Sequence, residues 1–99
     1  MYVIRNTMHC KPGRVKELVT IFKQLNQIMK GMGHPLHRIM TDVSGERFWT
    51  VVSELEIEKL DLQEEIMRQT MGDPKVAEAM KNYHNLVEWG HREIFKLES

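Results

Sequence analysis

The sequence predicts an α+β fold whose elements follow the order strand, helix, strand, strand, helix, strand. Three observations predict it. Short runs rich in alternating or β-branched residues lie near both ends and in the middle of the chain. Two stretches with apolar residues every three or four positions separate these runs. Turns rich in glycine and proline divide the segments, and the 99 residues suit one domain spanning residues 1–99.

Composition excludes several function classes. The 14 Lys and Arg residues balance the 14 Asp and Glu residues, whereas nucleic-acid-binding surfaces and polybasic membrane anchors need an excess of positive charge. The single cysteine, Cys10, excludes an internal disulfide and a cysteine-based zinc cluster. A free thiol together with eight methionines suits the reducing cytoplasm, where we expect the protein to reside. The first residues resemble no signal peptide.

The first strand is predicted over Tyr2–Cys10, with alternate side chains on opposite faces. A proline–glycine turn then leads into a helix predicted over about Arg14–Met32. The apolar stripe of this helix consists of Val15, Leu18, Phe22, Leu25, Met29 and Met32. Gly31 and Gly33 end the helix, and Pro35 prevents it from restarting.

The middle of the chain predicts a hairpin of two strands, Leu36–Val43 and Arg47–Ile57. Ser44–Gly45 between them is a turn signal. If the turn has only these two residues, Asp42 lies opposite Arg47, and opposite charges facing each other across two strands are favourable.

This register divides the hairpin into two faces that both carry large apolar groups. One face carries Leu36, Arg38, Met40, Trp49, Val51 and Leu55. The other face carries His37, Ile39, Thr41, Phe48, Thr50 and Val52. A sheet covered by helices on one side normally has a polar second face. We therefore expect the second face to pack against another copy of the chain.

The last third of the chain predicts an interrupted helix followed by a closing strand. A short helix over about Leu62–Met71 ends at a glycine, and Asp73 then caps a second helix that has Pro74 in its first turn. The apolar face of this second helix consists of Val76, Met80, Tyr83 and Val87. Gly90 is expected to stop the helix, and His91–Leu97 to form the last strand.

This order of elements is that of the ferredoxin-like split βαβ unit. Four further features reduce the number of protein families that fit this order. They are a first strand that runs into Lys11–Arg14, a long hairpin, a second helix broken by Gly-Asp-Pro, and a final segment Leu86–Ile94. Together they resemble the dimeric α+β barrel proteins, in particular the small NIPSNAP-like and antibiotic-biosynthesis-monooxygenase-like members. The resemblance implies a homodimer in which two antiparallel sheets form a shared barrel. It also implies a small-molecule pocket in each subunit, between the helices and the sheet face that carries Trp49 and Met40.

The resemblance implies no single activity, because this fold serves heme-degrading monooxygenases, cofactor-free monooxygenases, muconolactone-isomerase-like enzymes and proteins without known activity. Heme-degrading relatives use an Asn on the first strand, a Trp on the third and a His on the second helix. Asn6, Trp49 and His84 are similar in placement, so His84 is a candidate heme ligand. The alternative interpretation is a solvated or hydrogen-bonded structural histidine. We expect no cofactor, with heme as the alternative.

Seven residues are candidates for lining the pocket. They are Asn6, Arg38, Met40, Trp49, Met80, Tyr83 and His84. No metal site is expected, since His34 and His37 have no accompanying carboxylate motif, and His37 is expected to face the dimer partner. Cys10 is interpreted as a structural thiol.

The strand arginines allow two interpretations. They are Arg5, Arg38 and Arg92. They are either an anion clamp in the pocket or, as we favour because a charged group on a strand needs a partner, structural arginines paired with Glu54, Glu88 or Glu93.

The sequence thus predicts a cytoplasmic homodimer that binds a small apolar or aromatic ligand in a cleft between sheet and helices, with its activity undetermined. The alternative function is a monooxygenase, heme-degrading or cofactor-independent, that uses the same cleft. A third possibility is an interaction module whose only property is dimerisation. The neutral net charge predicts no nucleic-acid partner and no membrane partner.

Overall fold

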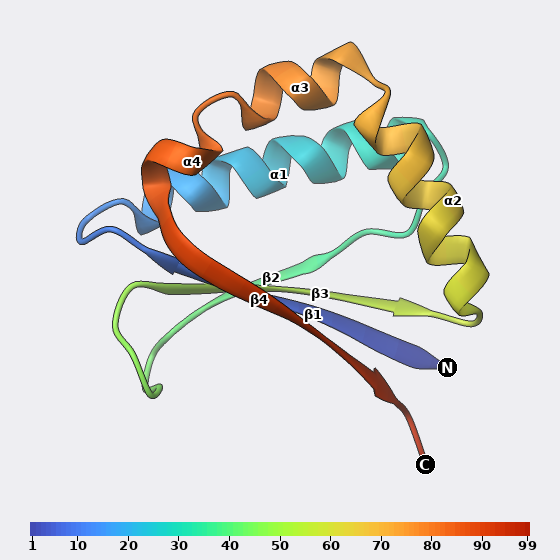
Figure 1. Cartoon of the computed structure of the whole chain (residues 1–99), viewed down its shortest axis with the longest axis horizontal. Coiled ribbons are helices and arrows are strands. Elements are labelled where there is room, and N and C mark those ends of the chain that lie inside the picture. Colours follow the sequence, from blue (N-terminus) through green and yellow to red (C-terminus); the bar gives the residue numbers. More distant parts are fainter.

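The helices lie over one face of a four-stranded antiparallel sheet whose strand order is β2-β3-β1-β4 (Figure 1). This computed structural model describes residues 1–99. The elements are β1 Tyr2–Cys10, α1 Val15–Gly31, β2 Arg38–Thr41, β3 Thr50–Ile57, α2 Leu60–Met71, α3 Pro74–Met80, α4 Tyr83–Leu86 and β4 Val87–Lys96. The predicted α+β, ferredoxin-like element order is confirmed. The helices are too short or too polar to cross a membrane.

Two clusters of buried side chains form the core between the helices and the sheet. The larger cluster consists of Met8, Cys10, Leu18, Ile21, Val51 and Leu86. The smaller cluster consists of Ile4, Leu55 and Ile57. In β1, Ile4 and Met8 share one face, as the alternation predicted, and the structure shows that this face meets the helices.

The predicted hairpin register is wrong. Arg38 lies opposite Glu54 and Met40 lies opposite Val52, so that residues 42–49 form a longer loop. The side chain of Asp42 closes this loop, since its Oδ1 atom accepts a hydrogen bond of 2.8 Å from the backbone N–H of residue 50. The sequence-based register differs from the observed one by an odd number of residues, which turns β2 over relative to β3.

Every side chain of β2 changes face because of this shift, and so does His37 just before it. Arg38 and Met40 lie on the face away from the helices, and His37 lies on the helix side. Phe48 belongs to neither sheet face but to the loop, where it is exposed. Trp49 has a φ of 62°, so the extended strand begins only after it.

The long second helix predicted up to Gly90 is shorter than expected. The cap is confirmed, because the Asp73 carboxylate accepts a hydrogen bond of 2.7 Å from the backbone N–H of Lys75. However, α3 ends at Met80, α4 is a single turn, and β4 begins at Val87. Gly90 therefore lies inside a strand. A residue with a side chain would clash at this position, since its Cβ atom would lie 2.8 Å from the backbone carbonyl oxygen of Thr7.

The second sheet face is covered by no helix (Figure 1). We call it the open face. It carries Val3, Arg5, Thr7, His9, Arg38, Met40, Thr50, Val52, Glu54, Trp89, His91, Glu93 and Phe95. Glu54 accepts hydrogen bonds of 2.8 Å from both Arg5 and Arg38, which confirms the paired interpretation of these two arginines. Burial alone would raise the pKa of Glu54, but the two guanidinium groups hold it below its ordinary value.

Candidate functional site

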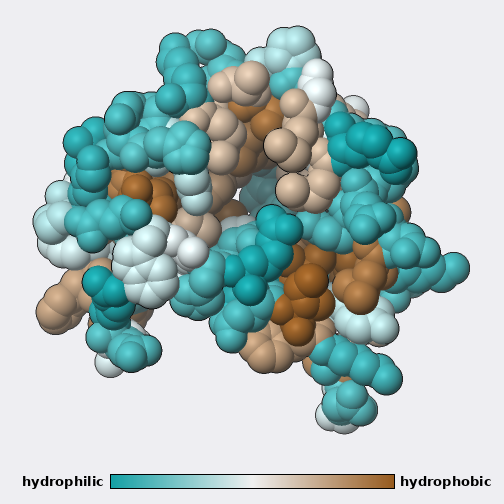
Figure 2. Space-filling model, in the orientation of Figure 1, coloured by the Kyte–Doolittle hydropathy of each residue, from teal (hydrophilic) through white to brown (hydrophobic).

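A cleft of about 520 Å³ lies between the helices and the sheet. It is lined by Asn6, Met8, Phe22, Ser53, Met80, Tyr83, Gly90, His91 and Arg92. A hollow between the helical layer and the sheet is visible in the space-filling view (Figure 2). The volume of the cleft falls within the range of clefts that hold small molecules.

The floor of the cleft is a polar band that crosses three strands. Asn6 of β1 is paired with Ser53 of β3 on one side and with Arg92 of β4 on the other. The Arg92 Nε atom donates a hydrogen bond of 2.8 Å to the Asn6 Oδ1 atom. The band interrupts an apolar surface, because Ile4 and Met8 flank Asn6 along β1 and are both buried. Because these polar side chains also line the cleft, the band is a candidate for ligand recognition.

His37, which lies on the helix side just before β2, contacts this floor at Ser53. Its Nδ1 atom lies 3.0 Å from the Ser53 hydroxyl oxygen. The Asn26 amide of α1 fixes the His37 backbone through two hydrogen bonds, donating one to its carbonyl at 2.9 Å and accepting one from its N–H at 3.0 Å. Burial lowers the pKa of His37, and the charge of Arg92 lowers it further. The imidazole is therefore neutral at neutral pH. We expected His37 on the sheet face toward a dimer partner, but it lies on the helix side.

The wall of the cleft is largely apolar. Phe22 of α1, Met80 of α3 and Tyr83 of α4 form it, and the Phe22 and Tyr83 rings contact edge to face with 6.4 Å between centroids. Burial, and secondarily the nearby Cys10, raise the pKa of the Tyr83 phenol, so it is a neutral hydrogen-bonding group. Burial also raises the pKa of the Cys10 thiol, in agreement with the structural role predicted for it.

The structure brings three of the seven candidate residues together in this cleft, namely Asn6, Met80 and Tyr83. Arg38 and Met40 lie on the open face instead, because the observed pairing of β2 with β3 differs from the predicted pairing by an odd number of residues.

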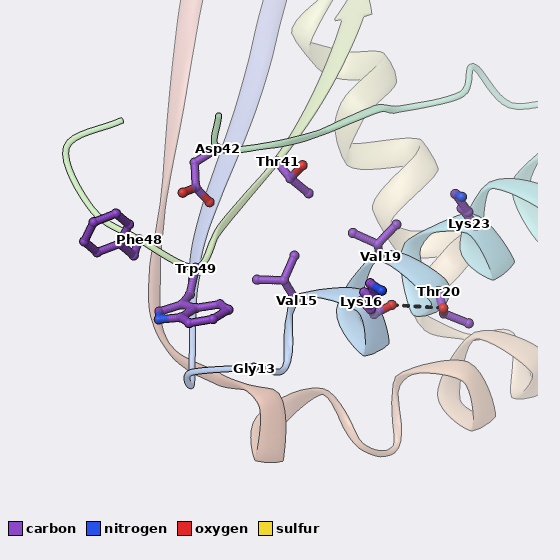
Figure 3. A pocket seen from close by; sticks show the side chains of 10 residues that line it. All are labelled: Gly13, Val15, Lys16, Val19, Thr20, Lys23, Thr41, Asp42, Phe48 and Trp49. Atoms are coloured by element: carbon purple, nitrogen blue, oxygen red, sulfur yellow. Dashed lines mark hydrogen bonds between the residues drawn. The ribbon is translucent and has the colours of Figure 1, made fainter. Parts of the chain in front are cut away.

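Trp49 and His84 lie outside the cleft. Trp49 lines a separate groove of about 880 Å³ together with Val15 and Val19 of α1 (Figure 3). His84 is exposed and contacts the Tyr83 ring edge to face, with 5.3 Å between centroids. Because Asn6, Trp49 and His84 do not line one cleft, their placement does not match the heme-binding arrangement that the resemblance implied.

The sequence reasoning missed most of the cleft floor and part of its wall. Met8 could have been found, because the alternation along β1 places it on the same face as Asn6. Phe22 was assigned to the apolar stripe of its helix but not to the pocket. Arg92 was one of the strand arginines for which an anion clamp was an interpretation, but nothing placed it beside Asn6. Ser53 carries no local signal, since both residues reach Asn6 only through pairing between strands that are distant in the sequence.

We expect the free energy of unfolding to fall as the pH drops below about 6.5. The lowered pKa of His37 means that the unfolded chain, with its ordinary pKa of 6.5, takes up a proton that the folded protein accepts only at lower pH. The loss is about 1.4 kcal/mol for each pKa unit between the two states. His9, whose pKa is also lowered by burial and by Arg47, acts in the same direction.

Urea unfolding at about pH 7.5 and about pH 5.5 measures this loss. His37→Gln should show a smaller loss than the wild type, because one of the two histidines no longer titrates. His84→Gln is the control and should behave like the wild type, since its side chain is exposed. A His37→Gln variant that loses as much stability as the wild type would contradict the expectation.

No protein-family model and no curated protein sequence matches the chain. Its fold, however, is similar to several solved structures. A NIPSNAP family protein of unknown function from Agrobacterium tumefaciens has a TM-score of 0.85 and 19% identity, covering 98% of this chain and 87% of its own. An uncharacterised NIPSNAP domain protein from Burkholderia xenovorans has a TM-score of 0.83 and 16% identity, covering 100% and 96%.

A third solved structure extends the likeness beyond the NIPSNAP proteins. It is a protein from Deinococcus radiodurans assigned as an antibiotic biosynthesis monooxygenase, with a TM-score of 0.67, 12% identity, and 100% and 94% of the two chains covered. At these identities the likeness concerns the fold. The resemblance predicted from the sequence is confirmed at that level, and the chain has the ferredoxin-like α+β fold of NIPSNAP and monooxygenase-like proteins.

Proposed function

We propose that the protein is a small homodimer that binds a small, largely apolar or aromatic molecule in the cleft between the sheet and the helices. The cleft itself carries this proposal. Phe22 and Met80 in its wall can contact the apolar part of a ligand, and Asn6 and Ser53 in its floor can form hydrogen bonds with the ligand. A concave, mostly apolar surface with a few converging polar groups is typical of small-molecule sites.

The open face supports the dimer. Its apolar side chains are partly exposed, with Met40 at 39%, Trp89 at 44% and Phe95 at 44% of their full accessible surface. No helix of the same chain covers them (Figure 1). A second copy that presents the same face would remove them from water, which is the main driving force for association. The central Val52 would then lie in the interface.

Filling the cleft tests the proposed binding. We expect the neutral fluorescent probe N-phenyl-1-naphthylamine to bind the wild type saturably, and Met80→Trp to weaken this binding about tenfold or more, because the indole occupies the space along the wall. Met71→Trp is the matched control, since Met71 is 76% exposed and lies outside the cleft. Circular dichroism confirms that each variant is folded. Equal binding by the two variants, or no saturable binding by the wild type, would contradict the proposal.

A monooxygenase that acts in the same cleft is the second candidate. The likeness to the Deinococcus radiodurans protein favours it, since that structure covers the whole chain. The placement of His84 outside the cleft favours the cofactor-independent version over the heme-dependent one. In the cofactor-independent version, the substrate itself would react with oxygen while the apolar wall excludes water.

A further inference from the structure

We propose that the ligand of the cleft carries a carboxylate, which Arg92 binds while the apolar body of the ligand lies along Phe22 and Met80. This inference rests on the proposed function and adds the chemical class of the ligand, an amphipathic monocarboxylate. Three observations support the inference: the charges of the residues that line the cleft, the hydrogen bond that orients the Arg92 side chain, and the position of Arg92 relative to His37.

Arg92 differs from the other strand arginines in having no carboxylate partner. Arg5 and Arg38 share Glu54 on the open face, whereas Arg92 lies on the helix-covered face and takes part in no ion pair. Its one side-chain hydrogen bond runs from Nε to Asn6. This bond orients the guanidinium plane and leaves both terminal nitrogens available. Two parallel N–H groups of this kind match the two oxygens of a carboxylate.

The lining of the cleft contains no acidic residue that would oppose an anion. Besides Arg92, the polar side chains that line it are those of Asn6, Ser53 and Tyr83, whereas the side chain of His91 lies on the open face. The larger groove beside Trp49 differs in this respect, because Asp42 lines it together with Lys16 and Lys23. Of the two, only the cleft has a positively charged side chain and no carboxylate in its lining.

The position of His37 offers a way to observe the anion. The imidazole itself contacts the Ser53 hydroxyl of β3, and the charge that acts on it is that of the Arg92 guanidinium of β4, whereas the Asn26 amide of α1 binds only the backbone of His37. The positive charge of Arg92 contributes to lowering the pKa of His37. An anion bound to Arg92 would oppose that charge and raise the pKa of His37.

Two probes that differ only in the head group test the inference. Calorimetric titration at neutral pH and low salt compares 3-phenylpropionate with 3-phenylpropan-1-ol. We expect the wild type to bind the acid about tenfold more tightly than the alcohol, because a charged hydrogen-bonded pair forms only with the acid. Arg92→Gln should bind both equally, and Arg92→Lys should retain part of the preference. Lys96→Gln removes the same charge from the far end of β4 and should retain all of it.

The outcomes separate this inference from the proposed function. If neither probe binds the wild type, the binding cleft itself is refuted. If both probes bind the wild type equally, the cleft remains and the carboxylate is refuted. As a second measurement, NMR titration of His37 should show a higher pKa with bound 3-phenylpropionate than without it. An unchanged value in the wild type would overturn the inference even if Arg92→Gln failed to fold.

Discussion

Replacing Leu86 with alanine is expected to lower the free energy of unfolding by about 2–5 kcal/mol. Leu86 is fully buried and belongs to the larger core cluster with Leu18 and Val51. It also lies where α4 ends and β4 begins, and its carbonyl oxygen accepts a hydrogen bond of 2.9 Å from the backbone N–H of Lys11. The substitution therefore removes apolar contacts and leaves a cavity at the point where the last helical turn is attached to the sheet.

Urea unfolding of the two proteins at one protein concentration measures this loss, since dimerisation makes stability depend on concentration. Leu62→Ala is the matched control. Leu62 is 43% exposed, so we expect its loss to remain within about 0.5 kcal/mol. Losses of the same size in the two variants would show that Leu86 does not hold the core together.

Replacing Val52 with aspartate is expected to dissociate the proposed dimer into folded monomers. Val52 lies in the middle of the open face, paired with Thr7 of β1 and Met40 of β2. In the monomer its side chain is partly exposed, so the aspartate remains in contact with water. In the dimer a carboxylate at this position would be buried next to Glu54, which already binds Arg5 and Arg38, and an uncompensated buried charge costs about 3–5 kcal/mol of dimer stability.

Light scattering over a range of protein concentrations measures the mass. The wild type should have twice the monomer mass of 11.7 kDa, and Val52→Asp should have the monomer mass. Val43→Asp makes the same chemical change at a fully exposed loop position and should remain dimeric. A monomeric wild type, or a Val52→Asp variant that stays dimeric, would refute the proposed interface.

The first strand and the first helix could be predicted closely from the sequence. The observed strand has the predicted bounds, and the observed helix, Val15–Gly31, is one residue shorter at each end than predicted. Both patterns depend on local periodicity, with two residues per repeat in a strand and 3.6 in a helix. The same periodicity placed Asn6 and Arg5 on opposite faces of the strand.

The hairpin could not be predicted in the same way. Ser44–Gly45 signals a turn, but the signal does not say how many residues the turn closes. In the structure the Asp42 carboxylate closes a longer loop, and Trp49 precedes the strand in a left-handed conformation. Because a shift by an odd number of residues reverses the faces of one strand relative to the other, this single difference moved Arg38 and Met40 out of the predicted pocket.

The sequence by itself determined the fold class, the division of β1 into two faces and the part of the cleft wall formed by Met80 and Tyr83, because each of these follows from residues near one another in the chain. Only the tertiary structure decided the floor. Ser53 and Arg92 lie beside Asn6 through pairing of β1 with β3 and with β4. Strand order and register come from packing of the whole sheet, and no local pattern contains them.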